Sequence, residues 1–257
     1  QSEVFMANTD FRVGVIRPIE CFQEGWELIK DQYWLFFGIT IVGMLIGGLV
    51  PFGIILGAMI CGVYYCLFQK AAGQRVSFDG LFKGFEYFGP SLIVTLFLMV
   101  PAVILWTLVY IPMLIIQISA TNRRGGVDPD ILFPMLIGTG IGVFVIGIII
   151  ACIHALIMFA YPLIVERRLS GIEAFKLSAR AVFANLSGVI GLILCEFALG
   201  IIGYLLLCVG LYLVFPIMFA GVFVAYRKVF PPVETPFTSP PPPPNFNQPP
   251  NFANRGL

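Results

Sequence analysis

Charge is scarce in this sequence. Only 11% of the 257 residues are charged and 59% are hydrophobic, with a mean hydropathy of +0.95, whereas soluble domains carry roughly 25% charged residues. Because one soluble core cannot bury so much apolar surface, a soluble globular protein is excluded and an integral membrane protein is expected. The formal net charge of +1 gives no reason to expect a nucleic-acid partner.

Histidine is almost absent, and the cysteines lack metal-binding spacing. The chain has one histidine, His154, which excludes most zinc sites. The six cysteines form no CxxC pair and fall mostly inside apolar runs, where a thiol behaves as a small hydrophobe. No nucleophile with a neighbouring base and no phosphate-binding loop is present. We therefore expect no enzyme activity and no bound cofactor.

Long hydrophobic runs, in contrast, are plentiful. They cover residues 33–69, 89–118, 131–165 and 186–226. A membrane span needs about 20 apolar residues, so the first and last runs are long enough for two spans each. Breaks near Pro51 and near Cys208–Gly210 predict a hairpin in each. The two middle runs predict single long helices, kinked or tilted, which makes six transmembrane helices.

An amphipathic segment precedes each pair of spans. The three segments are IECFQEGWELIKDQYW (19–34), FDGLFKGFEYFGPS (78–91) and IEAFKLSARAVFANLS (172–187). Apolar residues recur in them at helical spacing, which is typical of helices lying in a membrane interface. We therefore predict an all-α polytopic membrane protein with six transmembrane helices as three pairs, each preceded by an interfacial amphipathic helix. Its parts are a cytoplasmic N-terminus with an amphipathic helix (1–32), a six-helix domain (33–230) and a proline-rich tail (231–257).

Basic residues set the orientation. With both termini in the cytoplasm, 13 of the 15 Lys and Arg residues lie inside, and only Arg123 and Arg124 lie outside. Four inside residues border the third amphipathic segment and are expected to contact anionic lipid headgroups. These are Arg167, Arg168, Lys176 and Arg180.

The third unit also carries a family resemblance. The stretch YPLIVERRLSGIEAFKLSARAV, followed by a hairpin ending in FPIMFAGVFVAYRKVF, resembles a bacterial group of uncharacterised six-helix integral membrane proteins. That group is related to the membrane domain of some glycerophosphoryl diester phosphodiesterases. The resemblance covers roughly residues 17–230 and implies a six-helix domain in a bacterial cytoplasmic (inner) membrane. It implies no catalytic residues, and this chain lacks the phosphodiesterase domain itself.

Two ionisable residues interrupt the spans. His154 and Glu196 are expected at similar depth on consecutive helices, and charged groups inside membranes are functional candidates. A hydrogen bond between them would cost less than either group alone in hydrocarbon. The pair could be a structural contact, a proton relay or a substrate contact, and His154 could instead be a ligand for haem or chlorophyll.

The tail is rich in proline. Residues 231–257 hold ten of the 19 prolines, and the motif PPNF occurs twice. Such a segment is expected to be extended polyproline II. Its phenylalanines Phe237, Phe246 and Phe252 would suit an apolar groove on another protein. The alternative is a linker without a partner.

Three functions are open at this point. The leading prediction is a non-catalytic scaffold or accessory subunit of a larger membrane complex, whose partners are other membrane subunits and lipids and whose tail binds a partner. The alternative is a transporter or channel for a small or lipid-like solute that uses His154 and Glu196. A further alternative is a cofactor- or pigment-bearing subunit through His154.

The accessory-subunit prediction has a direct test. Purification in mild detergent from the native membrane, followed by mass spectrometry, should recover defined partners at a fixed ratio. Truncation after Phe230 should remove them, because it deletes all three tail phenylalanines. If the protein comes alone in both forms, the subunit prediction is wrong.

Overall fold

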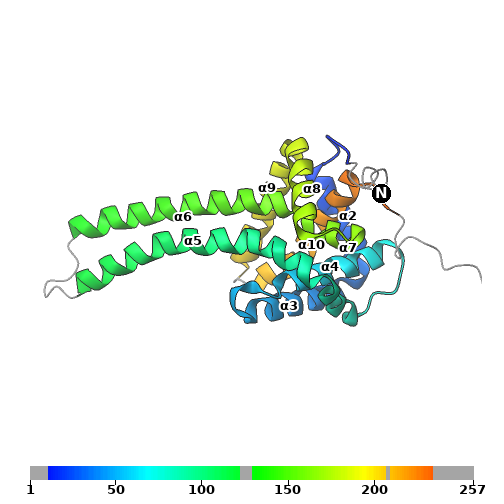
Figure 1. Ribbon diagram of the computed structural model, residues 1–257, viewed down its shortest axis with the longest axis horizontal. Coiled ribbons are helices and arrows are strands. Elements are labelled where there is room, and N and C mark those ends of the chain that lie inside the picture. The colour runs from blue at the N-terminus through cyan, green and yellow to red at the C-terminus, as the bar shows by residue number, and fades with distance from the viewer. Residues whose placement is uncertain (1–10, 122–128, 207–208, 234–257) are drawn as a thin grey trace, which may run out of the picture.

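The computed structural model describes residues 11–121, 129–206 and 209–233, and every regular element in these ranges is a helix (Figure 1). In chain order the elements are α2 (Pro18–Ile29), η1 (Lys30–Gln32), α3 (Tyr33–Leu49), η2 (Pro51–Gly53), α4 (Leu56–Ala71), η3 (Phe78–Tyr87), α5 (Phe88–Thr121), α6 (Pro129–Ile157), α7 (Ala160–Arg167), α8 (Gly171–Ala184), α9 (Leu186–Leu205) and α10 (Val209–Val229), where η marks a 3₁₀-helix. The predicted outside residues Arg123 and Arg124 and the tail residues Phe237, Phe246 and Phe252 lie outside these ranges.

Several helices are long and apolar enough to cross a membrane. Within the described ranges there are five, namely Pro18–Leu49, Phe78–Ile115, Leu136–Arg167, Leu186–Leu205 and Gly210–Val229. This confirms the prediction of an all-helical protein with the character of a membrane protein. Helix α4 would be the sixth span. Its 16 residues, at 1.5 Å each, give about 24 Å against a hydrocarbon thickness of about 30 Å, so the sixth span stays a prediction.

Consecutive long helices pack as antiparallel neighbours. Helix α3 packs against α4, α5 against α6, and α9 against α10. The first hairpin turns at Pro51–Gly53, where the break is predicted, and Gly53 has a φ of +61° that few other residues adopt readily. Helix α5 runs unbroken through Pro101 and Pro112. The run 131–165 is instead divided between α6 and α7.

Proline explains this division. The ring of Pro162 supplies no backbone N–H for the carbonyl four residues earlier, which belongs to Met158, and it crowds that carbonyl. The helix accordingly ends at Ile157 and restarts at Ala160. The next helix, α8, begins with a capping box, in which the Ser170 hydroxyl accepts from the backbone N–H of Glu173 and the Glu173 carboxylate accepts from the Ser170 N–H. The Ser170 hydroxyl also donates to the Glu173 carboxylate at 2.7 Å, and this bond, together with the one from the Ser170 backbone N–H, lowers the pKa of Glu173.

The three amphipathic segments form α2, η3 and α8, and each has two distinct apolar faces. Large side chains such as Ile19, Phe85 and Ile172 are exposed, as expected for a helix that meets lipid. The faces that pack on the protein combine small residues with larger apolar ones. The small buried residues are Cys21 and Gly25 in α2, Gly80 and Gly84 in η3, and Gly171, Ala174, Ser178 and Ala181 in α8. The helical spacing of apolar residues in the sequence indicates that these segments are amphipathic, but it does not indicate this second face.

One small residue of each segment marks a close crossing with the rest of the protein. A Cβ atom added to Gly25 of α2 would lie 2.7 Å from the backbone nitrogen of Gly221 in α10. One added to Gly84 of η3 would lie 2.6 Å from the backbone nitrogen of Gly62 in α4. In α8, the Ser178 hydroxyl donates to the carbonyl of Leu156 at 2.7 Å and accepts from the N–H of Phe159 at 3.2 Å. Helices α2 and η3 therefore meet α10 and α4 at backbone distance, and α8 is bonded to the break between α6 and α7 through the short Ser178 side chain.

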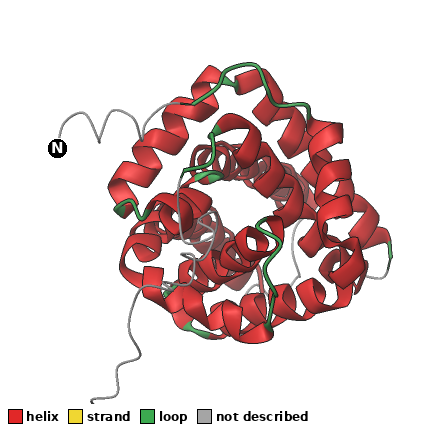
Figure 2. Ribbon diagram, turned by 90° about the vertical axis from the view of Figure 1, so that its right-hand side faces the viewer, coloured by secondary structure: helices red, strands yellow, loops and turns green. Residues whose placement is uncertain are grey.

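These crossings connect different pairs and close the molecule on itself. The amphipathic helix η3 covers the pair before it, α8 covers α5, α6 and α7, and α2, near the start of the chain, covers α9 and α10 at its end. Seen along the long axis of the molecule, the helices are arranged in a ring around that axis (Figure 2). Polar contacts support this closure: Lys228 binds Glu24 at 2.7 Å, and the backbone N–H of Arg12 donates to the carbonyl of Val229 at 2.7 Å.

Helices α5 and α6 project well beyond the other helices (Figure 1). They contain 34 and 29 residues, which at 1.5 Å per residue give about 51 and 44 Å. Large apolar side chains such as Trp106, Leu108, Phe133 and Phe144 are exposed along them. Even a 40° tilt would leave α5 longer than a bilayer's hydrocarbon layer of about 30 Å.

The backbone crossings predict a stability effect. Gly62→Ala places a Cβ against the carbonyl oxygen of Leu81 in η3, so the two helices must separate. We expect a loss of about 1–3 kcal/mol in the free energy of unfolding, measured by denaturing-detergent titration with circular dichroism. The control Gly48→Ala in α3, where a new Cβ meets nothing within 4 Å, should be neutral or slightly stabilising. Equal stability of the two variants would contradict the close crossing.

Candidate functional site

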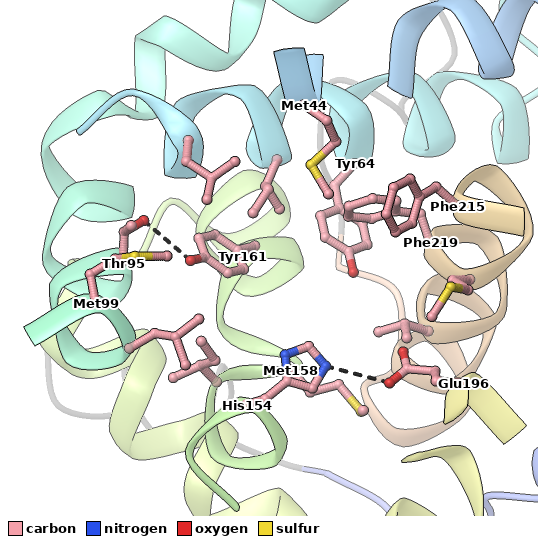
Figure 3. A pocket seen from close by; sticks show the side chains of 16 residues that line it. Met44, Tyr64, Thr95, Met99, His154, Met158, Tyr161, Glu196, Phe215 and Phe219 are labelled. Atoms are coloured by element: carbon pink, nitrogen blue, oxygen red, sulfur yellow. Dashed lines mark hydrogen bonds and ion pairs between the residues drawn. The ribbon is translucent and has the colours of Figure 1, made fainter. Parts of the chain in front are cut away.

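A cavity of about 270 Å³ lies in the centre of the helices (Figure 3). Its lining comes from α3, α4, α5, α6, α7, α9 and α10, so every one of the three helix pairs contributes. Ligand pockets in proteins typically measure roughly 300–1,000 Å³. The cavity lies just below this range, so it can hold only a small molecule.

The cavity wall is mainly apolar and adaptable. Four of the sixteen lining residues are methionines, which are Met44, Met99, Met158 and Met218. Four are aromatic, which are Tyr64, Tyr161, Phe215 and Phe219. Methionine side chains are flexible and polarisable, so they can reshape themselves around different apolar ligands.

His154 and Glu196, the two intramembrane residues singled out by the sequence, meet at this cavity. His154 lies on α6 and Glu196 on α9, and the structure places Nε2 of the imidazole 3.4 Å from Oε2 of the carboxylate. The Glu196 side chain is 12% exposed and that of His154 is 46% exposed. Apart from this contact, α6 and α9 pack on each other much less extensively than α4 and α5 do. The pair therefore bridges a thinly packed seam between the second and third helix pairs.

A second polar contact lies on the opposite side of the cavity. Oγ1 of Thr95 donates to the carbonyl of Ser91 at 2.9 Å, and the Tyr161 hydroxyl lies 3.2 Å from Thr95 Oγ1. Because Thr95 uses its one hydrogen on Ser91, Tyr161 is the donor in the second bond. The Tyr64 hydroxyl points into the space between this contact and the His154–Glu196 pair (Figure 3). Polar groups on several helices thus converge on one apolar chamber.

Among the residues that the structure describes, the most deeply buried carboxylate is Glu166, which sequence reasoning missed. Its side chain is 1% exposed. It accepts a hydrogen bond from the Tyr226 hydroxyl and another from Nη1 of Arg227 at 2.7 Å, which joins α7 to α10. The neighbouring arginines in ERR suggest a solvated segment, so only the apolar residues YPLIV before it signal burial. This cluster is fully partnered and does not line the cavity.

The four predicted headgroup residues differ in their surroundings. Arg168, Lys176 and Arg180 are exposed. Arg167 is only partly exposed: its guanidinium lies 5.2 Å from the centre of the Phe230 ring and donates to the carbonyl of Pro231 at 3.3 Å. Lipid binding by these residues stays a prediction.

Metal and cofactor sites can be assessed for the described ranges only. There, no group of three or more His, Cys, Asp or Glu side chains is placed to hold a metal ion. Cys21, Cys61, Cys66, Cys152 and Cys195 are free thiols in that part of the chain. As a haem or chlorophyll ligand through Nε2, His154 would have to give up its contact with Glu196, and this role stays a prediction.

Comparison with protein-family models, with curated proteins and with solved structures found no match. The resemblance to the phosphodiesterase-associated membrane domain therefore stays a prediction. The partner-binding tail also stays a prediction, because Phe237, Phe246 and Phe252 lie outside the described residues.

The contact between His154 and Glu196 can be measured with a double-mutant cycle. His154→Leu and Glu196→Leu should each destabilise the protein, and the double variant should show a coupling energy of about 0.5–1.5 kcal/mol, typical of polar contacts between membrane helices. Unfolding free energies in mixed micelles give the value. His154→Leu combined with Thr95→Val, across the cavity, should be additive to about 0.5 kcal/mol. Full additivity of the first cycle would show that the pair does not interact.

Proposed function

We propose that this protein is a non-catalytic membrane carrier that binds a small, lipid-like solute in its central cavity. The observation that carries the proposal is the position of the His154–Glu196 pair. Both residues line the cavity, to which all three helix pairs contribute. Their contact is therefore at the cavity wall and not in a closely packed part of the protein. A purely structural pair would need no cavity beside it, whereas convergent polar groups in an apolar pocket are the usual form of a ligand site.

The proposed architecture has six spans in three pairs. Five spans are long enough by themselves, and α4 is the sixth in this proposal because it packs against α3 and contributes Leu56, Ile60 and Tyr64 to the cavity. In this proposal the end of α4 that carries Lys70 faces the cytoplasm, and Lys70 binds Asp31 of η1 there. The proposed setting is a bacterial cytoplasmic membrane with both termini inside, supported by the 13 to 2 distribution of basic residues.

The geometry favours a carrier over an open channel. The cavity is bounded by bulky side chains, and η3 and α2 cross the helices at backbone distance. Alternating access in transporters is largely a rigid-body movement of one group of helices against another around the binding site. The thinly packed α6–α9 seam is the place where the pairs can separate most easily.

The proposal predicts a bound molecule that depends on cavity space. The purified protein, examined by native mass spectrometry, should retain a small molecule or lipid at about one per chain. Met44→Trp fills the cavity and should abolish this retention, whereas Leu45→Trp, on a neighbouring side chain that is 53% exposed, should leave it intact.

Two results would contradict the proposal. One is a wild-type protein with no bound mass under conditions that preserve lipid adducts. The other is equal loss in Met44→Trp and Leu45→Trp, since it would place the ligand outside the cavity. Circular dichroism and gel filtration of both variants establish that they fold.

A further inference from the structure

We propose that the cavity is a binding site for a small lipophilic cation, a quaternary ammonium with an apolar substituent, and that Glu196 supplies the opposite charge. This inference rests on the proposed function and adds the chemical class of the ligand. It follows from the charges on the wall, the rings around it and a second hollow beside it.

The ionisable side chains on the cavity wall favour a cationic ligand. Glu196 is the only carboxylate among the sixteen lining residues, and none of them is Lys or Arg. Its partner is His154 at 3.4 Å, longer than the 2.7–2.9 Å of a strong charge-assisted hydrogen bond. A carboxylate with so weak a partner in an apolar chamber is costly. A cationic ligand beside Glu196 would offset that cost, whereas an anionic ligand would increase it.

The rings around the chamber suit the same ligand. Tyr64, Tyr161, Phe215 and Phe219 all line the cavity, and the Tyr64 and Phe219 rings meet edge to face with centres 5.7 Å apart. Faces of aromatic rings attract organic cations, and quaternary ammonium groups are recognised in this way. The four methionines complete a wall that repels a strongly hydrated ion such as Na⁺ but accepts an alkylated one.

A second hollow indicates how such a ligand reaches the cavity. It lies on α9 and α10 and is lined by residues such as Phe197, Ile201 and Tyr204. Glu196 and Met218 line both this hollow and the central cavity. Phe197 is 67% exposed and Ile201 46%, so the hollow lies on a surface that faces hydrocarbon in a membrane. The ligand would therefore approach from the bilayer, which requires it to be lipophilic as well as charged.

The test compares two ligands of the same shape. The full chain in lipid nanodiscs is dialysed to equilibrium against radiolabelled benzyltrimethylammonium or neopentylbenzene, its neutral isostere, with binding to empty nanodiscs subtracted. We expect saturable binding of the cation by the wild type and at least tenfold weaker binding by Glu196→Gln. The neutral isostere should bind both proteins equally, which also shows that the cavity of the variant is intact. Glu27→Gln, an exposed acid on α2, should bind the cation like the wild type.

The outcomes separate this inference from the proposed function. If the neutral isostere binds and the cation does not, or if Glu196→Gln binds the cation as well as the wild type, the cation inference is wrong and the apolar cavity stands. If neither ligand binds and the wild type also carries no bound molecule in native mass spectrometry, both proposals fail.

Discussion

Close contact between helix backbones at small residues is the constraint on which this fold depends. At Gly25 on Gly221, and at Gly84 on Gly62, the backbones approach so closely that no side chain fits between them. In a membrane no hydrophobic effect drives helices together, because lipid is as apolar as the side chains, so such close packing and interhelical hydrogen bonds must supply the association energy. At the third crossing Ser178 takes the corresponding place and adds two hydrogen bonds to the break between α6 and α7. Each crossing joins different helix pairs, and together they close the first pair onto the last.

The cavity follows from this arrangement. The small residues let α2, η3 and α8 pack closely on the helix pairs, while the bulky side chains Tyr64, Tyr161, Phe215 and Phe219 surround the cavity. Across this space the seam between α6 and α9 is thinly packed, and the His154–Glu196 contact bridges it. The polar pair is therefore placed where it can both hold the seam and meet a ligand. Glu166, Tyr226 and Arg227 hold α7 to α10 without reaching the cavity.

Much of this was accessible from the sequence, for identifiable reasons. The long apolar runs and the break at Pro51 are local features, so they can be read from the sequence. Counting residues along the spans predicts a similar depth for His154 and Glu196, but their contact depends on how α6 and α9 are placed. The small-residue faces were missed because a glycine in an amphipathic segment gives no hydropathy signal, and its role appears only when the partner helix is known. Burial of Glu166 was missed for the same reason: its partners Tyr226 and Arg227 lie about 60 residues away along the chain. The cavity itself depends on how seven helices are arranged, which periodicity does not specify.

The central claim is that an imidazole and a carboxylate meet inside a membrane-embedded chamber. Since His154 is the only histidine in the chain, ¹⁵N-histidine labelling yields the imidazole signals of one residue. A solid-state NMR dipolar-recoupling measurement in lipid bilayers, on protein that also carries ¹³C-labelled glutamate carboxyl groups, would detect contact between the two. The account predicts dipolar coupling between Nε2 of His154 and one glutamate carboxyl carbon, lost in the Glu196→Leu variant. Absence of coupling in the wild type, or coupling that survives in Glu196→Leu, would contradict it.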